Sequence, residues 1–96
     1  MHLILAHYKG KRIYRLRTDL RNITIGRQPG NDITLEYRGV SSCHATVNFN
    51  GPQIYVTDLE TLNGTWYDGQ KIKKIGQVIP IGDQITIEGV NITFVE

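Results

Sequence analysis

The strongest constraint on the fold is a period of two in the apolar residues. Apolar side chains recur at every second position, with polar residues between them, at Ile23 and Ile25, Ile33 and Leu35, Ala45-Val47-Phe49, Ile54 and Val56, Ile85 and Ile87, and Val90-Ile92-Phe94. Successive side chains of a β-strand point to opposite faces, so this pattern predicts strands with one buried face. No long stretch shows the 3.6-residue spacing of an amphipathic helix.

Turn-forming residues separate these segments at short intervals. They occur at Lys9-Gly10, Pro29-Gly30-Asn31-Asp32, Asn50-Gly51-Pro52, Asn63-Gly64, Asp68-Gly69, Gly82-Asp83 and Gly89. Many short strands joined by such turns are typical of an antiparallel sandwich or barrel. The sequence therefore predicts an all-β fold, and its 96 residues suit a single domain, residues 1–96, with one core.

Charge is distributed unevenly along the chain. Residues 1–21 carry six Lys or Arg side chains against one Asp, giving +5, and the remaining residues carry five basic and eight acidic groups, giving −3, which sums to the net +2. A basic N-terminal segment favours an acidic ligand or nucleic acid, although a solvated surface is the simpler interpretation.

The hydropathy and the cysteine content limit the cellular compartment and the metal chemistry expected of this chain. The apolar run from Leu3 to Ala6 is too short to span a membrane and lacks the parts of a signal peptide. One cysteine, Cys43, excludes an internal disulfide and a zinc site built on thiolates. We therefore expect a cytoplasmic protein that uses no metal and no other cofactor.

Two loop segments carry groups suited to an anion. Gly26-Arg27 follows the segment that ends at Ile25; the glycine is expected to permit an unusual backbone turn. The planar fork of Arg27 matches two phosphate oxygens at once. Ser41 and Ser42 lie just before the next strand and offer hydroxyls and backbone N–H groups to an anion, with turn capping as the alternative for each.

Two further side chains have a structural and a binding interpretation. His44 has the opposite phase to Ala45, so it is expected to leave the core face, and we interpret it as a structural histidine that pins neighbouring loops. Asn63-Gly64 has the sequence of a hairpin turn. The amide of Asn63 can also both donate to and accept from a peptide backbone.

The polar segments 26–32, 37–44 and 60–65 are expected to converge at one end of a sandwich. Their combined pattern resembles the forkhead-associated (FHA) domain along essentially the whole chain. The matching motifs are Gly26-Arg27, Asp32-Ile33-x-Leu35, Val40-Ser41-x-x-His44-Ala45, Asp58-Leu59-x-Thr61-x-Asn63-Gly64-Thr65-x-x-Asp68-Gly69, Ile81-Gly82-Asp83-x-Ile85 and Ile92-x-Phe94.

The resemblance implies an eleven-stranded antiparallel β-sandwich whose end loops bind phosphothreonine in a protein or peptide. It implies that Arg27 and Ser41 contact the phosphate. Asn63 would hold the main chain of the ligand, and Ser42 would make a variable contact. Three further residues would shape the loops, namely Gly26, His44 and Gly64.

The sequence departs from the family pattern at two positions. Leu62 stands where many members have a threonine whose hydroxyl helps to bind the phosphate, and a leucine cannot do this. Asp68 replaces the asparagine that usually precedes the second glycine, and Asp-Gly serves the same turn.

An enzyme is the first alternative. Ser41, His44 and Asp58 are the residue types of a nucleophilic triad, but the Gly-x-Ser-x-Gly elbow and the helix behind it are missing. The segment Gly26–Asp32 lacks the Gly-Lys-Ser/Thr of a nucleotide-binding loop. We therefore expect no catalytic activity.

Two non-enzymatic alternatives remain open. Nucleic-acid binding through the basic first hairpin needs aromatic stacking or a recognition helix, and Tyr8 and Tyr14 are the nearby aromatic residues. A degenerate scaffold module would bind an unphosphorylated partner, or its own copy, through a sheet face. The expected protein is a monomer or part of a larger chain, without a membrane partner.

Overall fold

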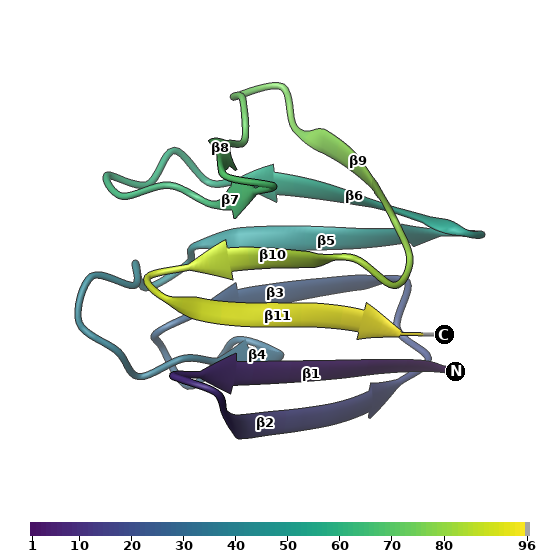
Figure 1. The fold of residues 1–96 in the computed structure, drawn as a ribbon, viewed down its shortest axis with the longest axis horizontal. Helices are drawn as coiled ribbons and strands as arrows, with labels where there is room; N and C mark the ends of the chain where they lie inside the picture. The colour runs from purple at the N-terminus through teal and green to yellow at the C-terminus, as the bar shows by residue number, and fades with distance from the viewer. Residues whose placement is uncertain (96) are drawn as a thin grey trace.

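The computed structural model describes residues 1–95, which form eleven β-strands and no helix (Figure 1). The predicted all-β class is confirmed. The strands are β1 (His2–Tyr8), β2 (Lys11–Thr18), β3 (Asn22–Gly26), β4 (Ile33–Thr34), β5 (Ala45–Asn50), β6 (Gln53–Asp58), β7 (Trp66–Tyr67), β8 (Gln70–Lys71), β9 (Gln77–Pro80), β10 (Gln84–Ile87) and β11 (Val90–Val95).

The strands form two sheets, as predicted for a sandwich. One sheet has the order β2-β1-β11-β10-β7-β8, and the other has the order β4-β3-β5-β6-β9. The named strands pair antiparallel except for β3 and β4, which run parallel with Ile25 opposite Ile33. This short parallel pair arises because the intervening loop doubles back: the Thr24 amide donates to Asp32 Oδ2 at 2.8 Å, and the Asp32 amide donates to Thr24 Oγ1 at 3.1 Å.

The core lies between the two sheets and follows the alternation in the sequence. In β5 the buried apolar residues are Ala45, Val47 and Phe49, and in β11 every second residue is buried in the same way. Phe49 and Phe94 meet edge to face across the two sheets, with ring centroids 6.2 Å apart. Burial of a side chain of this size contributes about 1.5–3 kcal/mol to the free energy of folding. The packed strands therefore support the loops at their ends.

The connections 27–32, 35–44 and 59–65 lie at one end of the sandwich, opposite the end at which β1 begins and β11 ends (Figure 1). The connection 59–65 crosses from β6 in one sheet to β7 in the other. Asn63-Gly64 therefore does not form the hairpin turn that its sequence also allowed. The predicted convergence of the three polar segments follows from this topology.

Candidate functional site

Backbone hydrogen bonds join the loop after β3 to the loop before β5. The Arg27 amide donates to the Ser41 carbonyl at 2.9 Å, and the Gln28 amide donates to the Ser42 carbonyl at 3.3 Å. The side-chain amide of Asn31 donates to the same Ser42 carbonyl at 2.8 Å. The Arg27 side chain is exposed, Ser41 is half-buried and Ser42 is exposed. Arg27 and Ser41 thus belong to one braced surface.

Gly26 is required for space and not for an unusual backbone turn, so the expected reason for this glycine was wrong. Its φ lies outside the left-handed region. A Cβ atom at this position would overlap the carbonyl oxygen of Ser42 and lie 2.6 Å from Asn31 Nδ2. Only a residue without a side chain lets the two loops approach this closely.

His44 joins the second loop to the third. Its ring is fully buried, contrary to the expectation that it leaves the core, because it precedes the first residue of β5 and turns in between the loops. Its Nδ1 accepts a hydrogen bond from the Ser41 amide at 3.1 Å, so the ring proton is on Nε2. Nε2 donates to the Gly64 carbonyl at 2.9 Å.

An acidic side chain at the end of β6 organises the third loop. Asp58 accepts hydrogen bonds from the Thr61 amide at 2.9 Å, the Thr61 hydroxyl at 2.8 Å and the Thr65 hydroxyl at 2.8 Å. The Thr61 hydroxyl accepts in turn from the Gly64 amide at 2.9 Å. From the sequence alone we assigned no structural role to Asp58, Thr61 or Thr65, although an Asp followed three residues later by Thr is a typical side-chain-to-backbone motif.

The same bonds rule out a nucleophilic triad of Ser41, His44 and Asp58. A triad needs one ring nitrogen free to take the proton of the serine hydroxyl. Here the Ser41 backbone amide occupies Nδ1, and the Gly64 carbonyl occupies Nε2. Asp58 Oδ1 is 3.7 Å from Nε2, which is beyond hydrogen-bond distance.

Asn63 lies where the second and third loops meet. Its side-chain amide is exposed and donates to the Gly39 carbonyl at 3.3 Å. Its own carbonyl accepts from Trp66 Nε1 at 3.0 Å, so Trp66 helps to position Asn63. A Cβ atom at Gly39 would lie 2.7 Å from Glu88 Oε2 and 3.2 Å from Asn63 Nδ2, so these two side chains cover Gly39.

Gly64 and Leu62 flank Asn63 and differ in their surroundings. Gly64 is buried and has a φ of 82°, in the left-handed region that favours glycine. Leu62 is 90% exposed. This leucine therefore presents an apolar surface beside the loops, where a threonine would present a hydroxyl.

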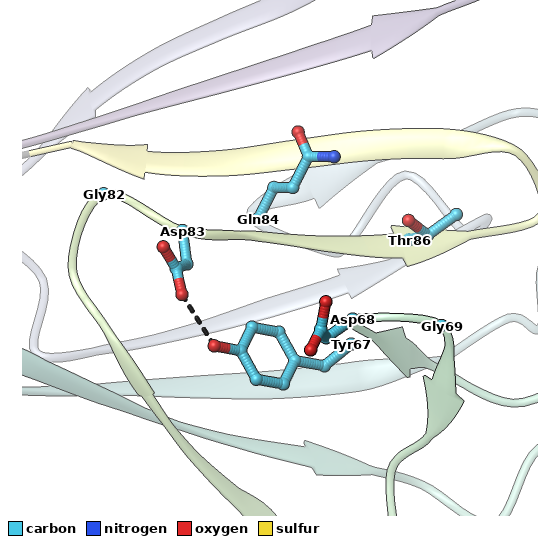
Figure 2. Close-up of a pocket in the computed structure, with 7 residues that line it drawn as sticks. All are labelled: Tyr67, Asp68, Gly69, Gly82, Asp83, Gln84 and Thr86. Carbon is cyan, nitrogen blue, oxygen red and sulfur yellow. Dashed lines mark hydrogen bonds between the residues drawn. The ribbon is translucent and has the colours of Figure 1, made fainter.

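One cavity lies on the six-stranded sheet (Figure 2). The Tyr67 hydroxyl donates to Asp83 Oδ2 at 2.6 Å there, and this hydrogen bond raises the pKa of Tyr67 above its ordinary value of 10.0. None of the predicted site residues lines the cavity, whose volume is about 520 Å³ and whose lining residues are Tyr67, Asp68, Gly69, Gly82, Asp83, Gln84 and Thr86.

Neither a metal-ligating cluster nor a membrane-spanning helix occurs among the described residues. Within residues 1–95, no group of three or more His, Cys, Asp or Glu side chains is arranged to hold a metal ion. The same residues include no helix that is long and apolar enough to cross a membrane.

The sequence and the fold are similar to those of one family. Residues 23–88 match the family model described as the FHA domain, and the chain belongs to this family. The chain is 35% identical over 80 residues to an oxoglutarate dehydrogenase inhibitor of Corynebacterium jeikeium and 34% identical to that of Corynebacterium glutamicum. These matches cover 83% of this chain and 54% of each relative, so the chain spans about half the length of the curated relatives.

Solved structures show the same fold. The FHA domain of the CT664 protein from Chlamydia trachomatis has a TM-score of 0.86 at 19% identity, over 99% of this chain and 96% of that one. EmbR of Mycobacterium tuberculosis, solved in complex with a low-affinity phosphopeptide, has a TM-score of 0.76 at 28% identity, over 97% of this chain and 24% of that one.

Proposed function

We propose that this domain is a protein–protein interaction module that binds a phosphothreonine-containing segment of a partner through the loops 26–28, 39–42 and 61–64. One observation carries the proposal: hydrogen bonds and a buried histidine tie these three loops together. They leave the charged side chain of Arg27 exposed beside Ser41. Loops held rigidly in this way can present several polar groups to one ligand at the same time.

Arg27 and Ser41 are the proposed phosphate contacts. No described carboxylate forms an ion pair with Arg27, so its guanidinium has no internal competitor for an anion. A phosphothreonine carries a charge near −2 at neutral pH and three strong acceptor oxygens. Hydrogen bonds to such a group contribute about 1.5–3 kcal/mol each.

Asn63 and Ser42 are proposed to contact the rest of the ligand. The Asn63 side chain makes one bond within the protein, to Gly39, and an amide has further donor and acceptor capacity for a peptide main chain. Ser42 is exposed at the rim and supplies a variable contact. Leu62 adds no hydroxyl, so the phosphate is held by fewer groups than in members with threonine there.

We infer that the domain acts by binding and not by catalysis, as a regulatory part of a cytoplasmic protein. The support is the pair of relatives named as inhibitors of oxoglutarate dehydrogenase, a name that describes action on another protein. Gly26, His44 and Gly64 are proposed to shape the loops, and residues 1–96 to form one domain, on its own or within a longer chain.

A peptide library tests the proposal directly. The immobilised domain is offered phosphothreonine peptides of random flanking sequence, together with the same peptides without phosphate and with phosphoserine. We expect selection of the phosphorylated peptides over the unmodified ones, with phosphothreonine preferred to phosphoserine. Burial of the extra methyl contributes about 0.8 kcal/mol, which gives a preference over phosphoserine of about fourfold. Equal recovery of phosphorylated and unmodified peptides would contradict the proposal.

A further inference from the structure

The strand β2 lies at an open edge of the sandwich (Figure 1). One side of β2 pairs with β1, from His2 opposite Thr18 to Tyr8 opposite Lys11. Within residues 1–95, no strand pairs with its other side. An edge strand of eight residues presents backbone N–H and C=O groups that can pair with a further strand.

The edge is strongly cationic. Lys11, Arg12, Arg15 and Arg17 are exposed, and no ion pair among the described residues engages them. Arg15 and Arg17 project on the outer face of the sheet, because their neighbours on β2, Leu16 and Thr18, are the less exposed residues. Four unpaired cations on one strand favour an acidic partner.

A groove runs beside this edge. It has a volume of about 470 Å³ and is lined by Ile13, Tyr14, Thr34, Leu35, Glu36 and Tyr37, that is, by β2 and by the segment around the end of β4. The β1–β2 register shifts between Ala6 and His7, so that Ile13 has no partner on β1. A bulge of this kind redirects a side chain, and Ile13 lines the groove instead.

We propose that β2 binds an extended acidic segment of a partner protein by strand addition, with an apolar side chain of that segment in the groove. Strand addition supplies affinity through the backbone, and alternate side chains supply specificity. The groove includes Leu35, Glu36 and Tyr37, at the start of the connection that later carries Ser41. The inference uses none of the proposed phosphate contacts, so it does not rest on phosphothreonine binding.

Two other occupants fit the edge less well. A nucleic acid would need aromatic rings for stacking. The Tyr8 ring already packs on Tyr37, with centroids 4.8 Å apart, and the Tyr14 hydroxyl donates to the Asp32 carbonyl at 3.1 Å. A second copy paired through β2 would place arginines against arginines, which is unfavourable.

The test uses a short peptide of alternating valine and glutamate, titrated into the isotope-labelled domain and followed by amide chemical shifts and hydrogen exchange. A valine–lysine peptide and an oligothymidylate are the comparison probes. The variant is Arg15→Glu with Arg17→Glu. The matched control is Lys73→Glu with Lys74→Glu, which makes the same change of charge on exposed residues across the molecule. A milder pair, Arg15→Gln with Arg17→Gln, serves if the charge reversal impairs folding.

We expect the acidic peptide to shift and protect amides of β2 and of residues 34–37. The β2 charge reversal should weaken binding by about tenfold, the glutamine pair by about threefold, and the control by less than about twofold. Absence of shifts in β2 at millimolar peptide, or equal binding of the valine–lysine peptide, overturns the proposal. Tighter binding of oligothymidylate than of the acidic peptide also overturns it, in favour of a nucleic-acid surface.

Discussion

At the scale of single residues, His44 does most to hold the loops in place. Replacing it with alanine removes the acceptor of the Ser41 amide and the donor to the Gly64 carbonyl, and it leaves a cavity. We expect His44→Ala to lower the free energy of unfolding by about 2–4 kcal/mol. In a domain of this size each 1 kcal/mol shifts the melting temperature by about 4–8 °C, which calorimetry measures easily.

Ser41→Ala is the control for this prediction. It removes a hydroxyl that makes no hydrogen bond among the described residues, while the Ser41 amide still bonds to His44. Ser41→Ala should therefore weaken phosphopeptide binding and leave the melting temperature nearly unchanged. A His44→Ala protein with the stability of the unmodified domain would refute the structural role of His44.

Gly26, the last residue of β3, and Gly30, in the connection that follows it, form a matched pair. A Cβ atom at Gly26 overlaps the Ser42 carbonyl, whereas a Cβ atom at Gly30 meets nothing within 4 Å. Neither glycine has a φ in the left-handed region. We expect Gly26→Ala to destabilise the domain by about 1–3 kcal/mol. Gly30→Ala should be neutral or stabilising by up to about 1 kcal/mol, because it restricts the unfolded chain. Equal denaturation midpoints for the two variants would show that the close approach is unimportant.

At the scale of elements, the loop between β6 and β7 depends on the Thr61 hydroxyl. Thr61→Val keeps the shape of the side chain but removes the donor to Asp58 and the acceptor of the buried Gly64 amide. We expect a loss of about 1–3 kcal/mol and faster hydrogen exchange at the Gly64 amide. Thr57→Val, in β6 and without a side-chain hydrogen bond among the described residues, should change stability by less than about 0.5 kcal/mol. Unchanged exchange at Gly64 in Thr61→Val would contradict this account of the loop.

The bond from Tyr67 in β7 to Asp83, the residue before β10, makes stability depend on pH. The bond to the carboxylate raises the pKa of Tyr67 above 10.0 in the folded state. The bond therefore contributes fully below the unfolded-state pKa near 10, and its contribution is lost as pH rises through the higher folded-state pKa. Asp83→Asn should lower the pKa of Tyr67 towards 10.0, as followed by phenolate absorbance. An identical titration curve in both proteins would rule out the bond in solution.

At the scale of the whole molecule, the fold could be predicted from the sequence because each strand buries one face. The alternation in β5 and β11 matches the buried residues one for one. The parallel placement of β4 could not be predicted, because it depends on bonds between Thr24 and the distant Asp32.

The candidate site was predicted less completely, for a similar reason. The resemblance to a family placed Arg27, Ser41 and Asn63 in loops that the structure brings to one end. The burial of His44 and the close approach at Gly26 depend on neighbours far along the chain, Gly64 and Ser42, which local patterns do not reveal. The bond from Trp66 to the Asn63 carbonyl likewise has no signature in the sequence.

The central claim is that the loop end of the sandwich binds phosphate through Arg27, and one titration tests it most directly. A phosphothreonine peptide and its unmodified twin are titrated by calorimetry into the unmodified domain, into Arg27→Ala and into Arg21→Ala, which removes another exposed arginine. We predict that the unmodified domain and Arg21→Ala bind only the phosphorylated peptide, with affinities within about threefold of each other. Arg27→Ala should bind the phosphorylated peptide about 100-fold more weakly or not detectably. A folded Arg27→Ala domain that binds the phosphorylated peptide within about threefold of the unmodified domain would contradict the claim.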